Sequence, residues 1–276
     1  MELLRPSSLA ELDGGLAIHG GTEVVPLLRD GILEADRLVD IRGIVPRGID
    51  GNVIGAGTTL AELEASTAIP DALREACTLA ASPQLRNMSS LGGNLLQSTR
   101  CWYWRLGYPC RLHRVGEGWG DRCHAREGEH REHAIFANDF CASAHPSDIA
   151  AALLALGARI RTTKRELPLE ELYRLPDEAN RDIVTLDPGE LILELELPQV
   201  EASTYLKAMD RKRWSFPQVG VAAARRGGEI RIALAGVAPI PWLLGADGLD
   251  GATPLPRTAW KIAVAKALVA RAAARL

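Results

Sequence analysis

Four of the five cysteines gather in one stretch of the chain, where their thiolates could ligate a metal centre. Cys101, Cys110, Cys123 and Cys141 follow the spacing C-x8-C-x12-C-x17-C. This spacing lacks the two close CxxC pairs of a zinc ribbon, whereas a looped insert can deliver four thiolates to a [4Fe-4S] cluster from any spacing. The residues alone leave three alternatives open: an iron–sulfur cluster, a zinc site, and a loop without metal.

The same stretch is rich in aromatic and histidine side chains. Residues 100–123 hold three of the six tryptophans and two of the four tyrosines of the chain. Nearby histidines make a mixed Cys/His zinc site a real competitor, and they are His113, His124, His130, His133 and His145. Cys77 stands apart in a predicted helix, where we expect it to be a small buried hydrophobe.

Two glycine pairs form a second candidate site. They lie in "AIHGGTE" (residues 17–23) and "SSLGGNLL" (residues 89–96). An anion needs converging backbone N–H donors, and glycine turns after strands provide them without obstructing side chains. Neither segment is a GxGxxG fingerprint or a phosphate loop with a trailing lysine, so a Rossmann or P-loop nucleotide site is not supported.

The elements that position these residues begin with two α/β units. The sequence predicts a strand over 15–21, a helix over 22–31 and a strand over 37–44, which together form a small βαβ element. A second strand over 52–57 leads into a helix capped by Thr58 or Thr59, with Glu62 as the acid of a capping box. Another helix is expected over residues 69–81, and residues 87–98 are expected to be irregular.

The pattern dissolves between residues 100 and about 144, and regular structure returns after it. Residues 146–163 predict a capped amphipathic helix followed by a strand. A stretch rich in proline and acidic residues, 167–189, places a boundary near residue 175. Beyond it, "ELILELELP" alternates with period two, and "QVGVAAARR" and "EIRIALAGVAP" are typical of neighbouring antiparallel strands. An amphipathic helix closes the chain and is expected to pack on that sheet.

Composition excludes several classes of function. The 276 residues are 47% apolar and 24% charged, with a net charge of −3 and no polybasic run, which argues against a nucleic-acid binder. No apolar run is long enough for a membrane span, and the first residues lack the features of a secretory signal. We therefore expect a cytoplasmic protein, or a periplasmic one co-exported with a signal-bearing partner. No GxSxG or HExxH motif points to hydrolysis.

The two glycine segments together resemble the FAD-binding, medium subunits of the xanthine dehydrogenase and carbon monoxide dehydrogenase family of molybdenum hydroxylases. In that family, loops of the form aGGT(D/E) and (S/T)(I/V/L)GGN grip the FAD diphosphate. They correspond here to residues 20–23 and 90–94. The resemblance continues in order through "NVIGAGTTLAELE", "PSDIAAALLALGA", "GELILELELP" and "YLKAMDRKRWSFPQVGVAAA".

The resemblance implies an α+β protein with a PCMH-type FAD-binding fold, followed by a C-terminal antiparallel sheet with helices. The domains expected are 1–174, made of subdomains 1–50 and 51–174, and 175–276. FAD would lie between the N-terminal part and the C-terminal part, with Lys207 and Trp214 near the flavin ring. By register, the FAD-binding residues expected are Ala17, Ile18, His19, Gly20, Gly21, Thr22, Glu23, Ala81, Ser90, Gly92, Gly93, Asn94, Leu96, Asp148, Ile192, Lys207 and Trp214.

The resemblance also bears on the cysteines. Most flavin subunits of the family run almost directly from the GGN loop to the aspartate that corresponds to Asp148, whereas residues 98–145 intervene here. The segment is similar to the branch typified by bacterial periplasmic aldehyde oxidoreductases, whose flavin subunit carries an additional [4Fe-4S] cluster. The resemblance therefore implies that the four clustered cysteines ligate such a cluster.

The function implied is electron transfer. A large partner subunit would oxidise an aldehyde or N-heterocycle at a molybdenum cofactor, and a small partner with two [2Fe-2S] clusters would pass electrons to FAD on this chain. An external acceptor of unknown identity would receive them. Two alternatives remain: a stand-alone FAD oxidase, for which the C-terminal part is too small to hold a substrate-binding cap, and a zinc-binding scaffold.

Overall fold

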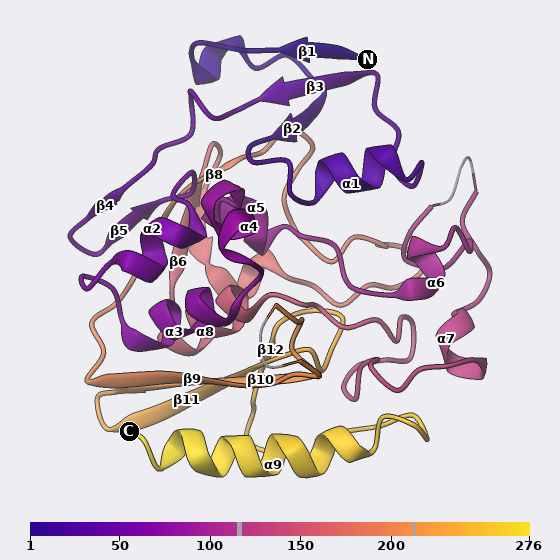
Figure 1. Ribbon diagram of the computed structural model, residues 1–276, viewed down its shortest axis with the longest axis vertical. Helices are drawn as coiled ribbons and strands as arrows, with labels where there is room; N and C mark the ends of the chain where they lie inside the picture. The colour runs from indigo at the N-terminus through magenta and orange to yellow at the C-terminus, as the bar shows by residue number, and fades with distance from the viewer. Residues whose placement is uncertain (115–117, 212–213) are drawn as a thin grey trace.

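A computed structural model describes residues 1–114, 118–211 and 214–276. Within them the chain forms three β-sheets stacked with helices, and Figure 1 shows the N-terminal sheet at one end and the C-terminal helix at the other. The first sheet is parallel, in the order β1-β3-β2, and α1 connects β2 to β3 as the predicted βαβ element. Its elements are β1 (Glu2–Leu4), the 3-10 helix η1 (Leu9–Glu11), β2 (Leu16–Ile18), α1 (Val24–Arg29) and β3 (Arg37–Asp40).

The second sheet is antiparallel, in the order β4-β5-β8-β6-β7. Its strands are β4 (Ile49–Asp50), β5 (Val53–Gly55), β6 (Arg159–Thr162), β7 (Glu166–Pro168) and β8 (Ile192–Glu196). Strand β8 lies between β5 and β6, so the sheet takes strands from both sides of the boundary expected near residue 175. The proline- and acid-rich stretch is therefore an excursion between two strands of one sheet, and the change of sheet comes after Glu196. The division into domains stays a prediction.

Helices fill the space between the second and third sheets. They are α2 (Leu60–Ala65), α3 (Asp71–Leu79), α4 (Pro83–Met88), α5 (Leu91–Leu95) and α8 (Asp148–Leu156). Thr59 caps α2 and forms the predicted capping box with Glu62. Every residue of α8 is buried, because this helix runs through the main hydrophobic core. Cys77 on α3 is fully buried in that core, which confirms the prediction of a small buried hydrophobe.

The third sheet is antiparallel, in the order β12-β11-β10-β9. Its strands are β9 (Ala202–Ala208), β10 (Val219–Arg226), β11 (Glu229–Ala235) and β12 (Trp242–Leu243). Alternation along β10 serves two cores: Ala222 and Ala224 face the main core, whereas Val219 and Val221 face a second core. Helix α9 (Trp260–Ala273) covers that second core, as Figure 1 shows. The α+β architecture expected from the sequence is confirmed.

The insert between α5 and α8 has little regular structure. Its described helices are single turns, α6 (Trp102–Arg105) and α7 (His124–Glu127), and they lie together on one side of the molecule in Figure 1. Lys261 of α9 ties this segment to the scaffold, because its buried ammonium group donates to the carbonyl oxygens of Glu132 and Gly236. None of the helices in the described residues has the length and apolarity needed to cross a membrane.

Candidate cofactor sites

The first glycine segment forms a tight loop between β2 and α1 and packs directly on the second segment. A Cβ atom on Gly20 would lie 1.7 Å from the carbonyl oxygen of Met88, so only glycine fits there. Gly21 has φ of +70°, a conformation that glycine adopts without strain. Thr22 and Ser89 share a hydroxyl–hydroxyl hydrogen bond of 3.0 Å. The two segments therefore meet through backbone contact and one polar pair.

The first loop leaves its backbone donors free. Within the described parts of the chain, the N–H groups of residues 20–23 donate to no protein acceptor. Unpaired N–H groups next to a cavity need a partner, and an anionic group supplies several acceptors at once. This loop therefore has the properties expected of an anion-binding loop.

The second glycine segment differs from the expectation. Residues 91–95 form helix α5, which Ser90 caps, rather than an irregular turn after a strand. Its N–H groups are already used: that of Gly92 donates to the Ala56 carbonyl, that of Gly93 to the Ser90 hydroxyl and that of Asn94 to the Ser90 carbonyl. The expectation that both segments present free N–H donors is therefore wrong for the second one, because Ser90 at the helix cap accepts from Gly93 and Asn94 and the segment after β5 accepts from Gly92.

Both segments line one large cleft. Its volume is about 580 Å³, which lies in the usual range for small-molecule sites. Most of the residues expected to bind FAD line it, including Ile192 at the start of β8 and Trp214. Ile18 and Lys207 are not among the lining residues.

Lys207 lies behind the cleft wall, in a buried polar cluster. Its ammonium group is 2.8 Å from Oδ2 of Asp148 and also donates to the Leu79 carbonyl, while the Tyr205 hydroxyl donates to Oδ1 of Asp148. Burial raises the pKa of Asp148, and the contacts with Lys207 and Tyr205 oppose that rise. Asp148 itself lines the cleft. Lys207 therefore positions and neutralises Asp148, and its own charge does not face the cleft.

Two residues of the cleft have strained backbones. Ala81 has φ of +46° and Trp214 has φ of +59°, a region that residues with a side chain occupy rarely. The Trp214 side chain is 59% exposed at the mouth of the cleft. Such strain persists only where the surrounding structure imposes it, and it concentrates at functional sites. Both residues belong to the set expected to bind FAD.

His19, one of the residues that line the cleft, has a buried ring nitrogen, Nδ1, without a hydrogen-bond partner in the described structure. Burial, followed by the charges of Arg42 and Arg47, lowers the pKa of His19, which favours the neutral ring. His19 lines the cleft, but Nδ1 has no accessible surface there, so a ligand would reach this nitrogen only after a rotation of the ring.

Sequence reasoning missed several lining residues. Arg100, Gln97 and Phe216 all line the cleft, and the Arg100 guanidinium stacks 4.3 Å from the centroid of the Phe216 ring. Arg100 directly precedes Cys101, so its sequence position suggests a place in the cysteine insert and not in the cleft. Phe216 is two residues from Trp214, and this short separation is the one signal that points to the cleft.

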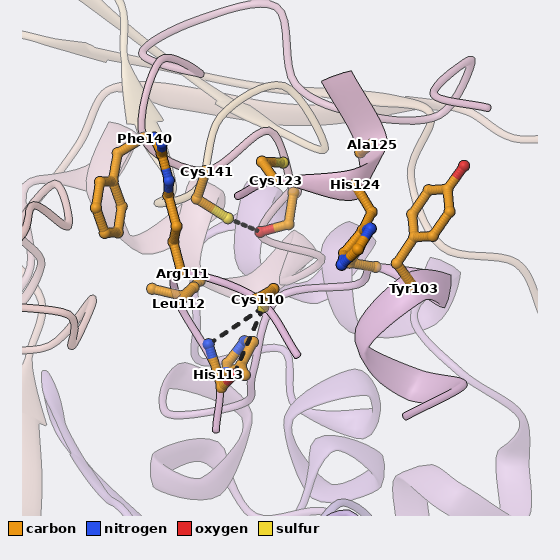
Figure 2. Close-up of a pocket in the computed structure, with 12 residues that line it drawn as sticks. Tyr103, Cys110, Arg111, Leu112, His113, Cys123, His124, Ala125, Phe140 and Cys141 are labelled. Carbon is orange, nitrogen blue, oxygen red and sulfur yellow. Dashed lines mark hydrogen bonds between the residues drawn. The ribbon is translucent and has the colours of Figure 1, made fainter. Parts of the chain in front are cut away.

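The four clustered cysteines line a second cavity. Figure 2 shows Cys110, Cys123 and Cys141 on three separate segments around one space, with Tyr103 and His124 on one side and Phe140 on the other. Cys101 also lines this cavity. All five cysteines of the chain are free thiols in the structure. The long sequence spacing therefore closes into one site, as the insert hypothesis requires.

Backbone and hydroxyl groups contact the sulfur atoms. The His113 N–H lies 3.3 Å from Sγ of Cys110, and the Ser143 hydroxyl lies 3.0 Å from Sγ of Cys141. Burial raises the pKa of the Cys101 thiol to about 11, and it raises the pKa of Cys110 and Cys141 as well. These thiols are protonated at neutral pH until a metal displaces the protons.

The site does not suit a single metal ion. In the described residues, no three Cys, His, Asp or Glu side chains are close enough together to hold one ion. Tetrahedral zinc needs sulfur atoms about 3.8 Å apart, given Zn–S bonds of about 2.3 Å. A four-iron cluster places its cysteines at separate corners of a cube and so accepts a wider arrangement.

Most of the histidines of this region have partners other than the four cysteines, and no three Cys or His side chains of the described residues lie close enough to share one ion. His113 stacks on Trp104 with ring centroids 3.8 Å apart, and its pKa is lowered to about 3, chiefly by burial. His130 is within hydrogen-bond distance of two backbone carbonyls, and Nε2 of His133 lies 3.4 Å from Sγ of Cys101. His124 contacts the Pro109 carbonyl, and His145 is fully buried against Tyr173. A mixed Cys/His zinc site is therefore not supported.

Comparison with known proteins defines the class to which the fold and cleft belong. Residues 3–200 match the model of the FAD binding domain in molybdopterin dehydrogenase, and the chain belongs to this family. It is an FAD-binding component of the oxidoreductase type found in molybdenum hydroxylases, as the resemblance implied.

Particular relatives agree with this assignment. The chain is 34% identical to the aldehyde oxidoreductase FAD-binding subunit PaoB of Escherichia coli over 260 residues, which cover 87% of this chain and 80% of that one. Among solved structures, it matches CO dehydrogenase from Oligotropha carboxidovorans with a TM-score of 0.67 and 21% identity, over 99% of this chain and 96% of the other. Quinoline 2-oxidoreductase from Pseudomonas putida 86 matches with a TM-score of 0.63 and 16% identity, over 98% and 94% of the two chains. These structures support the fold.

Proposed function

We propose that this chain is the FAD-bearing electron-transfer subunit of a heterotrimeric molybdenum hydroxylase of the aldehyde oxidoreductase type. Its partners would be a large subunit with the molybdenum cofactor and a small subunit with two [2Fe-2S] clusters. The substrate of the complex would be an aldehyde or an N-heterocycle. The 34% identity to an aldehyde oxidoreductase FAD-binding subunit supports this type. We place the complex in the cytoplasm, or in the periplasm by co-export with a signal-bearing partner.

The observation that carries the proposal is the cleft between the two glycine segments. When bound there, FAD supplies a centre that exchanges one or two electrons, which joins one-electron clusters to an external acceptor. The N–H groups of residues 20–23, which donate to no protein acceptor in the described structure, fit a diphosphate.

Other residues of the chain would position the cofactor and exclude water. Lys207 and Tyr205 hold the Asp148 carboxylate in one orientation at the cleft wall. Ile192 lines the cleft with an apolar side chain from the start of β8, and Trp214 lines it while remaining exposed to solvent. The ion pair of Asp148 with Lys207 is buried and hydrogen-bonded, so the Asp148 carboxylate would be a fixed acceptor for a donor group of the ligand.

We also propose that Cys101, Cys110, Cys123 and Cys141 ligate a [4Fe-4S] cluster. The donor set fits, since four thiols line the cavity and no carboxylate is among its described lining residues. The hydrogen bonds to Cys110 and Cys141 would favour their thiolate forms, and Tyr103, Phe140 and Leu112 would limit the access of water. The cluster would be a second redox centre on the flavin subunit or a structural one.

One preparation tests both parts of the proposal. The full chain, purified or reconstituted without oxygen, should show flavin absorption together with broad iron–sulfur absorption, and four irons for each FAD. Ser substitution of Cys110 should remove the iron and its absorption. A preparation that binds no FAD would sink the flavin assignment. Zinc in place of iron, or full iron content in the Cys110→Ser variant, would sink the cluster assignment.

A further inference from the structure

A single carboxylate joins the first glycine loop to the cysteine insert. Glu23 ends that loop, and its side chain receives hydrogen bonds from two arginines of the insert. Arg100 donates through Nη2 to Oε2 at 2.8 Å, and Arg105 donates through Nη2 to Oε1 at 2.5 Å. Both oxygens of Glu23 are thus occupied by residues more than 70 positions away in the sequence.

The three charged side chains are largely removed from water. Their exposed fractions are 19% for Glu23, 30% for Arg100 and 21% for Arg105. Partly buried ion pairs with bonds to both carboxylate oxygens hold geometry better than exposed pairs, whose net contribution is small. The pairs therefore constrain the direction in which the loop leaves β2.

The same two arginines flank Cys101 in the sequence. Arg100 directly precedes Cys101, and Arg105 ends the single-turn helix that Cys101 caps. Within that helix, Trp104 stacks on His113, whose backbone N–H group lies against Sγ of Cys110. The six-residue segment 100–105 therefore connects the Glu23 carboxylate to two of the four cysteines.

The triad carries one positive charge in excess. It holds two guanidinium groups and one carboxylate, and the Nε atoms of Arg100 and Arg105 are both buried without a hydrogen-bond partner. Arg100 also lines the cleft itself, stacked against Phe216. The excess charge lies beside the loop whose N–H groups are free, and it favours an anionic ligand there.

We infer that Arg100 and Arg105 are positioning residues for FAD: through Glu23 they hold the N–H groups of residues 20–23 in the geometry that binds the cofactor. FAD affinity and occupancy of the four-cysteine site are then linked. This inference rests on the proposed function. Because linkage is reciprocal, a metal centre that tightens FAD binding is itself retained more firmly when FAD is bound, by the same factor.

FAD titration of the deflavinated full chain tests the positioning role. We expect Arg105→Met to weaken FAD binding roughly 10-fold, a typical size for such coupling. Arg105→Lys should recover most of the affinity, because it keeps the charge. The matched control is Arg122→Met, since Arg122 lies in the insert but is 60% exposed, with its nearest carboxylate oxygen 3.8 Å away. Equal affinity of the Arg105→Met variant and the wild type would overturn the inference.

Iron release to a chelator tests the linkage with a readout that needs no activity. In the wild type, saturating FAD should slow the loss of iron by up to about 10-fold, because a change in affinity of that size lies mostly in the dissociation rate. In Glu23→Gln, which keeps the side-chain shape and removes the charge, this protection should disappear. Glu23→Gln also replaces Arg105→Met if the latter does not fold. Equal protection in Glu23→Gln and the wild type, or none in a wild type that binds both cofactors, would refute the linkage. A wild type that binds no FAD contradicts the proposed function instead.

Discussion

The FAD cleft and the cysteine cavity are neighbouring sites built in opposite ways. The cleft is lined from β2, α5 and β8, whose positions follow from strand pairing, helix packing and the contact of Gly20 with Met88. Among the described residues, the insert around the cavity has two single-turn helices, and its four cysteines are free thiols that are partly or fully buried. We therefore expect the shape of the cleft to depend less on a bound ligand than the order of the insert depends on a metal.

The largest expected effect follows from removing the metal. A structural metal contributes on the order of 10 kcal/mol to the order of its ligand loops, so its loss should open the insert and leave the scaffold intact. Trypsin should then cleave within residues 98–145 at least about 10-fold faster, while the rest of the chain stays protected. Mass mapping of the fragments measures this.

Restoring the iron is the control for that experiment and should restore protection. If the cleavage pattern is the same with and without iron, the contrast between a preformed cleft and a metal-dependent insert is wrong.

The next effect concerns the buried charges behind the cleft. Lys207→Met leaves the Asp148 carboxylate buried without its cation, which should cost about 3–5 kcal/mol of unfolding free energy. Urea denaturation measures this. Adding Asp148→Asn should recover part of the loss, because the unpaired charge is then removed. Lys164→Met is the control, because the pair between Lys164 and Asp187 is exposed and should contribute less than about 1 kcal/mol. Equal losses for the two lysine variants would contradict the coupling.

A smaller effect tests whether backbone contact shapes the cleft. Gly20→Ala places a methyl group against the Met88 carbonyl, and relieving that overlap should cost roughly 1–3 kcal/mol. If the displaced loop is the one that binds FAD, the affinity of the variant for FAD should fall by about 10- to 100-fold. Calorimetric titration with FAD measures this affinity. Gly43→Ala, where a Cβ would meet nothing within 4 Å, should bind FAD as the wild type does.

The last effect is on the pH dependence of stability, and it concerns His145, which lies where the insert rejoins the scaffold. Burial, followed by the charge of Arg100, lowers the pKa of His145 to about 3. Below pH 6.5 the unfolded chain binds a proton at His145 that the native chain excludes. The contribution of His145 to the free energy of unfolding is therefore complete above pH 6.5 and falls as the pH drops below that value. The loss at pH 5 should be about 2 kcal/mol. His145→Phe should remove that part of the pH dependence, and an unchanged slope between pH 7 and 5 would contradict the assignment.

Local signals predicted much of the scaffold. The capping box of Thr59 and Glu62, the βαβ element and the antiparallel pairing of β10 with β11 each depend on neighbouring residues, and all three are present. Contacts between residues far apart in the sequence could not be predicted. Nothing within residues 190–198 indicates that β8 pairs with β5 and β6, because register is set by the strands it meets.

In the candidate FAD site, too, local features were predictable and long-range contacts were not. The first glycine loop has the free N–H donors that its motif predicted, since no neighbouring residue competes for them. The second does not, because Ser90 caps a helix and accepts two of the N–H groups, while the Ala56 carbonyl accepts that of Gly92. The position of Lys207 behind Asp148 depends on side-chain contacts between β9 and the start of α8, which one sequence does not reveal.

The two ends of the insert lie against each other. The Arg100 N–H donates to the Ala144 carbonyl at 3.0 Å, as an isolated antiparallel bridge. A segment whose ends meet can enter or leave a chain as one cassette, because a short turn closes the gap without moving the scaffold. Its loss would remove the bond of Arg105 to Glu23 and would take Ile135 and Phe136 out of the second core. Variation in the length of this segment is therefore tolerated best between its paired base and these buried residues, away from the strands and helices that line the cleft.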